Sequence, residues 1–274
     1  MASSSSGACR VCDRVLPKGQ LTRHLRSCLK RTEGPLHQWL LVIEARYRRE
    51  YWLYLTVPPD VSLEKIDSFL RDIWVECCGH LSAFEFNNTT YLSEPEDEGD
   101  DLEESDDLEE GDDLEESDDS DEGDDLEASL TQKFEDIFQK LGFPADNMKE
   151  PWPTFKERDM AIPLQKVVHK GDKMKYQYDF GSTTELTLRV LDEDVRGPEE
   201  GITVVARNDR PQLDCEECGQ PAELVATDWN YVLYCASCAD KLGDEEKDFL
   251  LPVVNSPRMG VCDYCGGDED SQAD

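Results

Sequence analysis

The acidic segment between residues 94 and 127 restricts the fold of this chain more than any other feature. Of its 34 residues, 23 are Asp or Glu, and none is Lys, Arg or aromatic. It contains a six-residue repeat, seen at 101–106 and 107–112. Leucines six residues apart advance by about 240° around a helix, so they form no apolar stripe. Because the segment buries too little to offset chain entropy, we predict a disordered insertion over 96–127.

The rest of the chain is large enough for folded domains. Its 274 residues are 38% hydrophobic, and the net charge of −35 arises mainly in the acidic segment. No apolar run approaches the roughly 20 residues that a membrane helix needs, and residues 1–12 contain no apolar stretch typical of a secretory signal. We therefore expect a cytoplasmic protein with no membrane partner, whose 11 cysteines are thiols or metal ligands and not disulfides.

The segments on either side of the insertion have the patterns of one α+β domain. Alternating apolar residues predict two strands around 41–43 and 53–57, joined by a charged turn. Spacings of three and four from Leu63 to Trp74 predict a helix capped by Ser62, and a second helix is predicted over 130–141. Strict alternation over 174–180 and 186–190 predicts a hairpin, with a further strand at 202–206.

Three stretches of this domain resemble a known family. They are 51–58 (YWLYLTVP), 78–86 (CGHLSAFEF) and 176–181 (YQYDFG). They resemble the plasmid open-reading-frame-three family, whose members are labelled insertion-element passenger, TnpR-like proteins. The resemblance covers 36–95 and 128–207 and implies a compact α+β fold without an established reaction. Family members continue the last motif with Asp-Gly-Trp and a His, where this chain has Ser182 to Glu185.

The most specific chemical signal is a pair of Cys-x-x-Cys motifs near the C-terminus. Cys215 and Cys218 are separated by sixteen residues from Cys235 and Cys238. Each motif can supply two thiolates to a tetrahedral ion, and the spacer can form the hairpin that joins them. We predict a structural zinc site, because four thiolates leave no open coordination position. Free or redox-active thiols are the alternative.

A second ligand pattern lies at the N-terminus. Cys9 and Cys12 are followed after eleven residues by His24 and after three more by Cys28. A helix over 21–28 places His24 and Cys28 on one face, one turn apart. The pattern resembles a zinc finger with three cysteines and one histidine, so zinc is predicted here as well.

The same helix carries a basic surface. The first 34 residues contain seven Lys and Arg against two acids. We predict that the helix contacts a partner through four of these bases, namely Arg23, Arg26, Lys30 and Arg31. Phosphate of a nucleic acid and an acidic protein surface fit this charge equally well, and a purely structural role is also open. The acidic insertion could compete for this surface, and it could itself bind basic proteins or divalent cations.

The remaining cysteines give weaker signals. Cys262 and Cys265 form a lone Cys-x-x-Cys pair, for which half of a metal site, a redox pair and a packing role all remain open. Cys77 and Cys78 adjoin His80. Because neighbouring side chains of an extended chain point to opposite faces, we interpret these two cysteines as partly buried thiols.

Together these features predict an α+β fold. A central mixed sheet with packed helices, at 36–95 and 128–207, is flanked by small zinc-stabilised modules at 1–34 and 208–274. No motif of a catalytic zinc, a phosphate-binding loop or a serine nucleophile is present, so we favour a non-enzymatic binding or adaptor protein. Two alternatives are a DNA mimic, in which the acidic arm occupies a basic groove, and an enzyme whose catalytic residues converge in the central domain.

Overall fold

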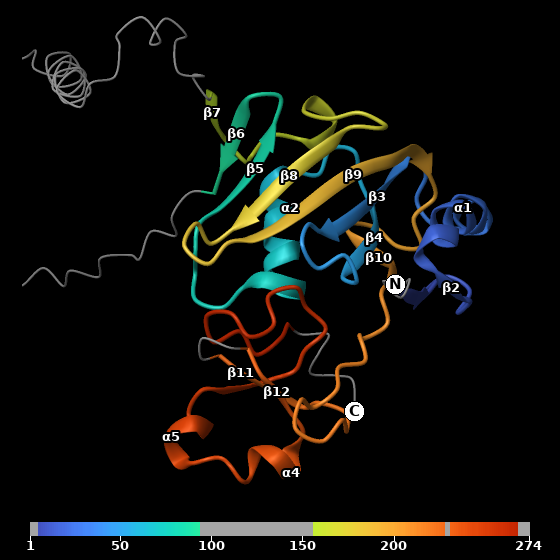
Figure 1. Ribbon diagram of the computed structural model, residues 1–274. Coiled ribbons are helices and arrows are strands. Elements are labelled where there is room, and N and C mark those ends of the chain that lie inside the picture. Colours follow the sequence, from blue (N-terminus) through green and yellow to red (C-terminus); the bar gives the residue numbers. More distant parts are fainter. Residues whose placement is uncertain (1–4, 94–155, 228–230, 268–274) are drawn as a thin grey trace, which may run out of the picture. The chain divides into compact units, whose positions relative to one another are not determined.

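The computed structural model describes residues 5–93, 156–227 and 231–267 (Figure 1). Among them it forms the predicted α+β fold around one large mixed sheet. The acidic insertion predicted over 96–127 and the helix predicted over 130–141 lie outside the described residues.

The large sheet of the described residues has eight strands. Every neighbouring pair is antiparallel except the last, in which the two strands are parallel. In spatial order the strands are β10 (Thr203–Arg207), β4 (Trp52–Val57), β3 (Gln38–Ala45), β9 (Thr184–Val195), β8 (Lys173–Tyr178), β5 (Ser82–Phe86), β6 (Thr89–Leu92) and β7 (Lys156–Asp159). Strands β4, β3, β9 and β8 confirm the strands predicted from alternation, although β8 ends at Tyr178, before the predicted end at 180, and β10 confirms the further strand predicted at 202–206.

Helix α2 (Leu63–Leu70) packs on one face of the sheet. The Ser62 side chain accepts a hydrogen bond from the backbone N–H of Lys65 and caps the helix, as predicted. After Leu70 the helix widens into a π-helical turn, η2 (Arg71–Val75), where Trp74 is fully buried. The core on this face contains Leu41 and Ile43 from β3 together with residues of β4, β8, β9 and α2.

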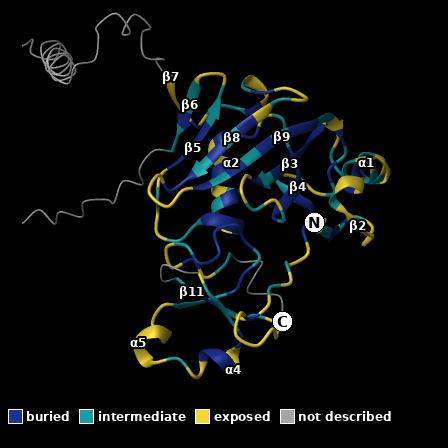
Figure 2. Cartoon of the chain, in the orientation of Figure 1, coloured by how far each residue is buried: buried dark blue, intermediate teal, exposed yellow. Residues whose placement is uncertain are grey.

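The opposite face of β3 and β4 is also buried. Leu40, Val42, Trp52 and Tyr54 alternate along these strands with the residues that face α2. Their partners are Leu21, Leu25 and Leu29, which come from α1 (Lys18–Cys28) and from the 3-10 turn η1 (Leu29–Arg31). The middle of the sheet is therefore covered on both faces, which explains why every residue of β4 is buried (Figure 2).

The N-terminal segment is also joined to the sheet through its backbone. A short hairpin, β1 (Ser6–Ala8) and β2 (Val15–Pro17), precedes α1. The backbone N–H of Arg10 donates to the Val205 carbonyl at 2.9 Å. A Cβ atom at Gly7 would lie 2.0 Å from the Arg207 carbonyl oxygen, so only glycine fits at this close approach to β10.

A smaller sheet follows in the C-terminal part of the chain. Its three strands, in the described residues, are β12 (Leu233–Tyr234), β11 (Leu224–Ala226) and β13 (Leu250–Pro252), with two single-turn helices, α4 (Ala236–Ala239) and α5 (Asp244–Lys247). The following segment returns to the large sheet. The hydroxyl of Ser256 donates to the Trp74 carbonyl at 2.7 Å, and the indole N–H of Trp74 donates to the Asn255 carbonyl at 3.2 Å.

Replacing Leu25 by Ala tests the packing of α1 on the sheet. Leu25 is fully buried, so Leu25→Ala leaves a cavity and should lower the free energy of unfolding by about 2–5 kcal/mol. Urea denaturation with zinc present measures the change. The control is Leu36→Ala, because Leu36 is 53% exposed and its loss should change the value by less than about 0.5 kcal/mol. Equal stability of the two variants would show that α1 does not share the core of the sheet.

Candidate metal centres

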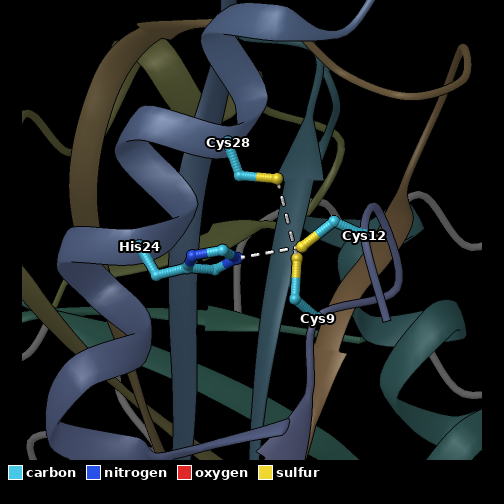
Figure 3. A group of neighbouring side chains, drawn as sticks. All are labelled: Cys9, Cys12, His24 and Cys28. Atoms are coloured by element: carbon cyan, nitrogen blue, oxygen red, sulfur yellow. Dashed lines mark hydrogen bonds between the residues drawn. The ribbon is translucent and has the colours of Figure 1, made fainter. Parts of the chain in front are cut away.

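Four residues of the N-terminal segment converge on one point, and we name them the N-terminal cluster: Cys9, Cys12, His24 and Cys28 (Figure 3). The two cysteines before α1 lie on a tight turn, in which the backbone N–H of Asp13 donates to the Cys9 carbonyl at 2.8 Å. Asp13 has a φ of 55°, which closes this turn. Helix α1 supplies His24 and Cys28 from one face, as their spacing of four predicts.

The four donor atoms of the N-terminal cluster lie close enough together to surround one ion. Cys12 Sγ lies 3.3 Å from His24 Nε2, and Cys9 Sγ lies 4.0 Å from Cys28 Sγ. All four donor atoms lie within 4.8 Å of one another. Ligands of a tetrahedral zinc ion are roughly 3.5–3.8 Å apart, given its bond lengths to sulfur and nitrogen. A disulfide would need sulfurs about 2.05 Å apart.

The ionisation of the ligands in the N-terminal cluster depends on burial and on their neighbours. Burial, together with the neighbouring thiol of Cys12, raises the pKa of Cys28 to about 12. The backbone N–H of Arg14 lowers the pKa of Cys12. Burial, and then the charge of Arg14, lower the pKa of His24, which favours the neutral imidazole that binds metals. Several thiolates can coexist here once a divalent ion offsets their mutual repulsion.

The C-terminal cluster consists of Cys215, Cys218, Cys235 and Cys238, whose four sulfurs also lie within 4.8 Å of one another. Each Cys-x-x-Cys motif forms a tight turn. The N–H of Gly219 donates to the Cys215 carbonyl at 2.8 Å, and the N–H of Cys238 donates to the Cys235 carbonyl at 3.1 Å. Strands β11 and β12 lie between the motifs, so the predicted hairpin in the spacer brings them together.

The thiols of the C-terminal cluster differ in how far they are buried and in the backbone N–H groups that lie near them. Cys215, Cys235 and Cys238 are buried, whereas Cys218 is exposed. Burial opposes ionisation of Cys215, but backbone N–H groups, including that of Cys235, lower its pKa to about 6. Cys218 Sγ lies 3.6 Å from Cys235 Sγ, the edge length of a zinc tetrahedron. Four sulfur donors leave no open position, so an ion here would stabilise the small sheet and would not activate water.

A third group of potential ligands is one that the sequence did not indicate. We name it the interface cluster: Cys77, Cys78, His80 and Cys262, whose donor atoms lie within 4.8 Å of one another. The interpretation of Cys77 and Cys78 as partly buried thiols is correct for Cys77, which is half-buried, and wrong for Cys78, which is exposed. Both side chains can face one point because the chain bends here and is not extended. No sequence signal links Cys262 to residues more than 180 positions earlier. Cys265 lies outside the group, and its thiol donates to the Asp263 carbonyl at 3.3 Å.

The four predicted contact bases lie on or beside α1. Arg23, Lys30 and Arg31 are exposed. Arg26 is half-buried and directed to the sheet, where its guanidinium donates to the Leu191 carbonyl at 2.5 Å and pairs with Asp192 at 3.4 Å. Arg26 therefore helps to hold α1 in place, while the other three face solvent. Among the residues that the structure describes, no helix has the length and apolar character needed to cross a bilayer.

Replacing two ligands of the C-terminal cluster should remove one metal ion. We expect the double variant Cys215→Ser/Cys218→Ser to bind one ion per chain fewer than the parent protein, because a site with two thiolates holds zinc poorly. Elemental mass spectrometry on protein purified without chelator measures this number. Cys265→Ser is the matched control and should leave it unchanged. Unchanged metal content in the double variant would show that these cysteines do not hold an ion.

Comparisons with known proteins do not assign this chain to a family. No family model matches the sequence, and no curated protein matches it either. Among solved structures, a protein of unknown function from Methanosarcina mazei Go1 aligns with 68% of this chain and 75% of its own, at 12% identity and a TM-score of 0.36.

Proposed function

We propose that this protein is a zinc-stabilised binding protein that contacts nucleic acid through the outer face of α1. The ligand sets support the choice of metal. Three thiolates with one imidazole, and four thiolates, are the donor sets of structural zinc sites, whereas Mg²⁺ and Ca²⁺ prefer oxygen. In this proposal zinc contributes to folding and takes no part in a reaction.

The exposed bases of α1 and η1, namely Arg23, Lys30 and Arg31, are the observation that carries the binding proposal. Helix α1 contains no acidic residue. Its inner side is occupied by the leucines that pack on the sheet and by the N-terminal cluster. A hollow of about 620 Å³ lies beside this helix, lined by the exposed Arg23, Ser27, Lys30 and Arg31 together with Gly19, Thr22 and the half-buried Arg26. A positively charged hollow suits a phosphate group.

The sheet and the metal give this face a fixed geometry. His24 and Cys28 would be tied to the turn at Cys9 by the ion, while Leu25 and Leu29 are buried against the sheet. Arg23 projects from this fixed helix, and Lys30 and Arg31 project from η1 directly after it, so less conformational entropy is lost on binding.

Within the same chain, the acidic segment at 94–127 would compete with nucleic acid for the exposed bases. Its 23 carboxylates could occupy the bases of α1 and weaken the binding of nucleic acid. The second candidate function rests on the same segment, as a DNA mimic that binds a basic protein in trans. The regular spacing of its carboxylates favours that candidate.

Removing the exposed bases tests the binding face. We expect Arg23→Ala/Lys30→Ala/Arg31→Ala to weaken binding to a short fluorescent DNA duplex and to lower the slope of log K against log salt by about 2–3, because up to three phosphate contacts are lost. Fluorescence anisotropy at several salt concentrations measures both quantities.

The matched control removes the same charge elsewhere. Lys166, Lys241 and Lys247 are exposed, and replacing all three by Ala should alter the affinity far less. Equal losses in the two variants would mean that binding follows net charge only. A parent protein that binds an acidic peptide and no duplex would replace the nucleic acid by a partner protein.

Deleting residues 94–127 separates the two roles of the acidic segment. If it competes for α1, the deletion should strengthen duplex binding, since the competing carboxylates are gone. The same anisotropy assay measures this change. Loss of a basic protein partner after the deletion, with no gain in duplex binding, would support mimicry and contradict autoinhibition.

A further inference from the structure

We infer that the interface cluster is a third zinc site, which fastens the C-terminal segment to the large sheet. The inference goes beyond the proposed function, because it concerns other residues and does not require nucleic acid. Its ligands come from the loop after η2, at Cys77, Cys78 and His80, and from Cys262, 182 residues after the last of these.

The four donor atoms lie close enough to one another to share one ion. Cys78 Sγ lies 3.6 Å from the sulfurs of both Cys77 and Cys262. His80 Nε2 lies 3.0 Å from Cys78 Sγ and 3.3 Å from Cys262 Sγ. Zinc ligands are roughly 3.5–3.8 Å apart, whereas bonded sulfurs are about 2.05 Å apart. The two sulfur separations match those of zinc ligands and exclude a disulfide, while the imidazole nitrogen lies closer to both sulfurs than in a filled zinc site.

The backbone turns at the points where the ligands must face inward. After η2 the chain bends, and Gly79 has a φ of 73°. On the other side, Cys262 and Asp263 have φ values of 48° and 53°, which non-glycine residues rarely adopt. Such conformations persist where surrounding interactions require them, and they collect at binding sites. Here these backbone conformations occur in both loops of the interface cluster, whose ligand side chains meet at one point.

Residues around the first loop hold it in this shape. The hydroxyl oxygen of Tyr178 accepts hydrogen bonds from the backbone N–H groups of Cys77, at 3.4 Å, and His80, at 3.3 Å. The carboxylate of Glu76 accepts from the N–H of Gly79 at 2.6 Å and from the Tyr178 hydroxyl at 2.8 Å. The ligands are therefore positioned by contacts that do not involve the metal.

A buried arginine supports the second segment. Arg258 is fully buried four residues before Cys262, and its guanidinium donates to Asp179 at 2.8 Å and to Thr184 Oγ1 at 3.1 Å. It also lies 3.3 Å from Cys77 Sγ. Three thiolates and a neutral imidazole around Zn²⁺ carry a net charge of −1, so a cation beside one sulfur stabilises the filled site.

The interface cluster is more exposed than the other two groups. Cys78 and Cys262 are exposed, Cys77 and His80 are half-buried, and no member is fully buried. The N-terminal and C-terminal clusters each contain at least one buried cysteine. A chelator therefore reaches this ion most easily, and we expect it to leave first. Its loss would release the segment around Cys262 from the loop after η2.

Counting zinc in matched variants tests the inference. The parent protein should contain about three ions per chain, Cys262→Ser about two, and Cys265→Ser about three, because only the first of these cysteines faces the cluster. Equal zinc content in the two serine variants would overturn the inference. The sites of the proposed function are counted separately, since Cys215→Ser/Cys218→Ser removes an ion whether or not the interface cluster binds one.

A second measurement uses the unaltered chain and so does not depend on a variant that folds. A chromogenic chelator added to the parent protein should release one ion in a fast phase. Hydrogen exchange should then show faster exchange in the segment 255–265, with little change in β3 and β4. Release of the first ion without a change in that segment would contradict a zinc ion bound at Cys262. Faster exchange confined to the small sheet would contradict it as well.

Discussion

The burial of both faces of β3 and β4 is the constraint on which the rest of the structure depends. Side chains of a strand alternate between the two faces of its sheet, and here both sets are apolar. One set is covered by α2, and the other is covered by α1, which precedes the large sheet in the sequence. Without α1, Trp52 and Tyr54 would be exposed to water at considerable cost in free energy. The N-terminal segment is therefore part of the core of the large sheet.

This constraint also determines the chemistry of α1. An 11-residue helix is marginally stable alone, and its leucines must face the sheet to be buried. The 3.6-residue repeat then fixes which side chains lie toward the turn at Cys9 and which face solvent. His24 and Cys28 fall on the first side and Arg23 on the second, while the exposed Lys30 and Arg31 follow directly in η1. A metal site and a charged surface thus follow from a single orientation of the helix.

The C-terminal part of the chain depends on different forces. Its strands have two or three residues, and its apolar clusters are small, so packing alone contributes little. The four thiols of the C-terminal cluster and the polar contacts of the returning segment compensate for this. Trp74, Ser256 and Arg258 join that segment to η2 and to the loop after it. The interface cluster lies next to these contacts. An ion bound there would add a second link between the C-terminal segment and the loop after η2.

Local pattern alone determined much of this protein. Alternation predicted β3, β4, β8 and β9, and Ser62 was identified as the cap of α2, because these features depend on neighbours in the sequence. The two clusters with short internal spacings were predicted for the same reason. The sequence did not reveal that α1 covers the sheet, that Arg26 turns inward to Leu191 and Asp192, or that Cys262 meets Cys78. Those contacts join residues more than 100 positions apart or depend on which face a helix buries, and only tertiary packing decides them.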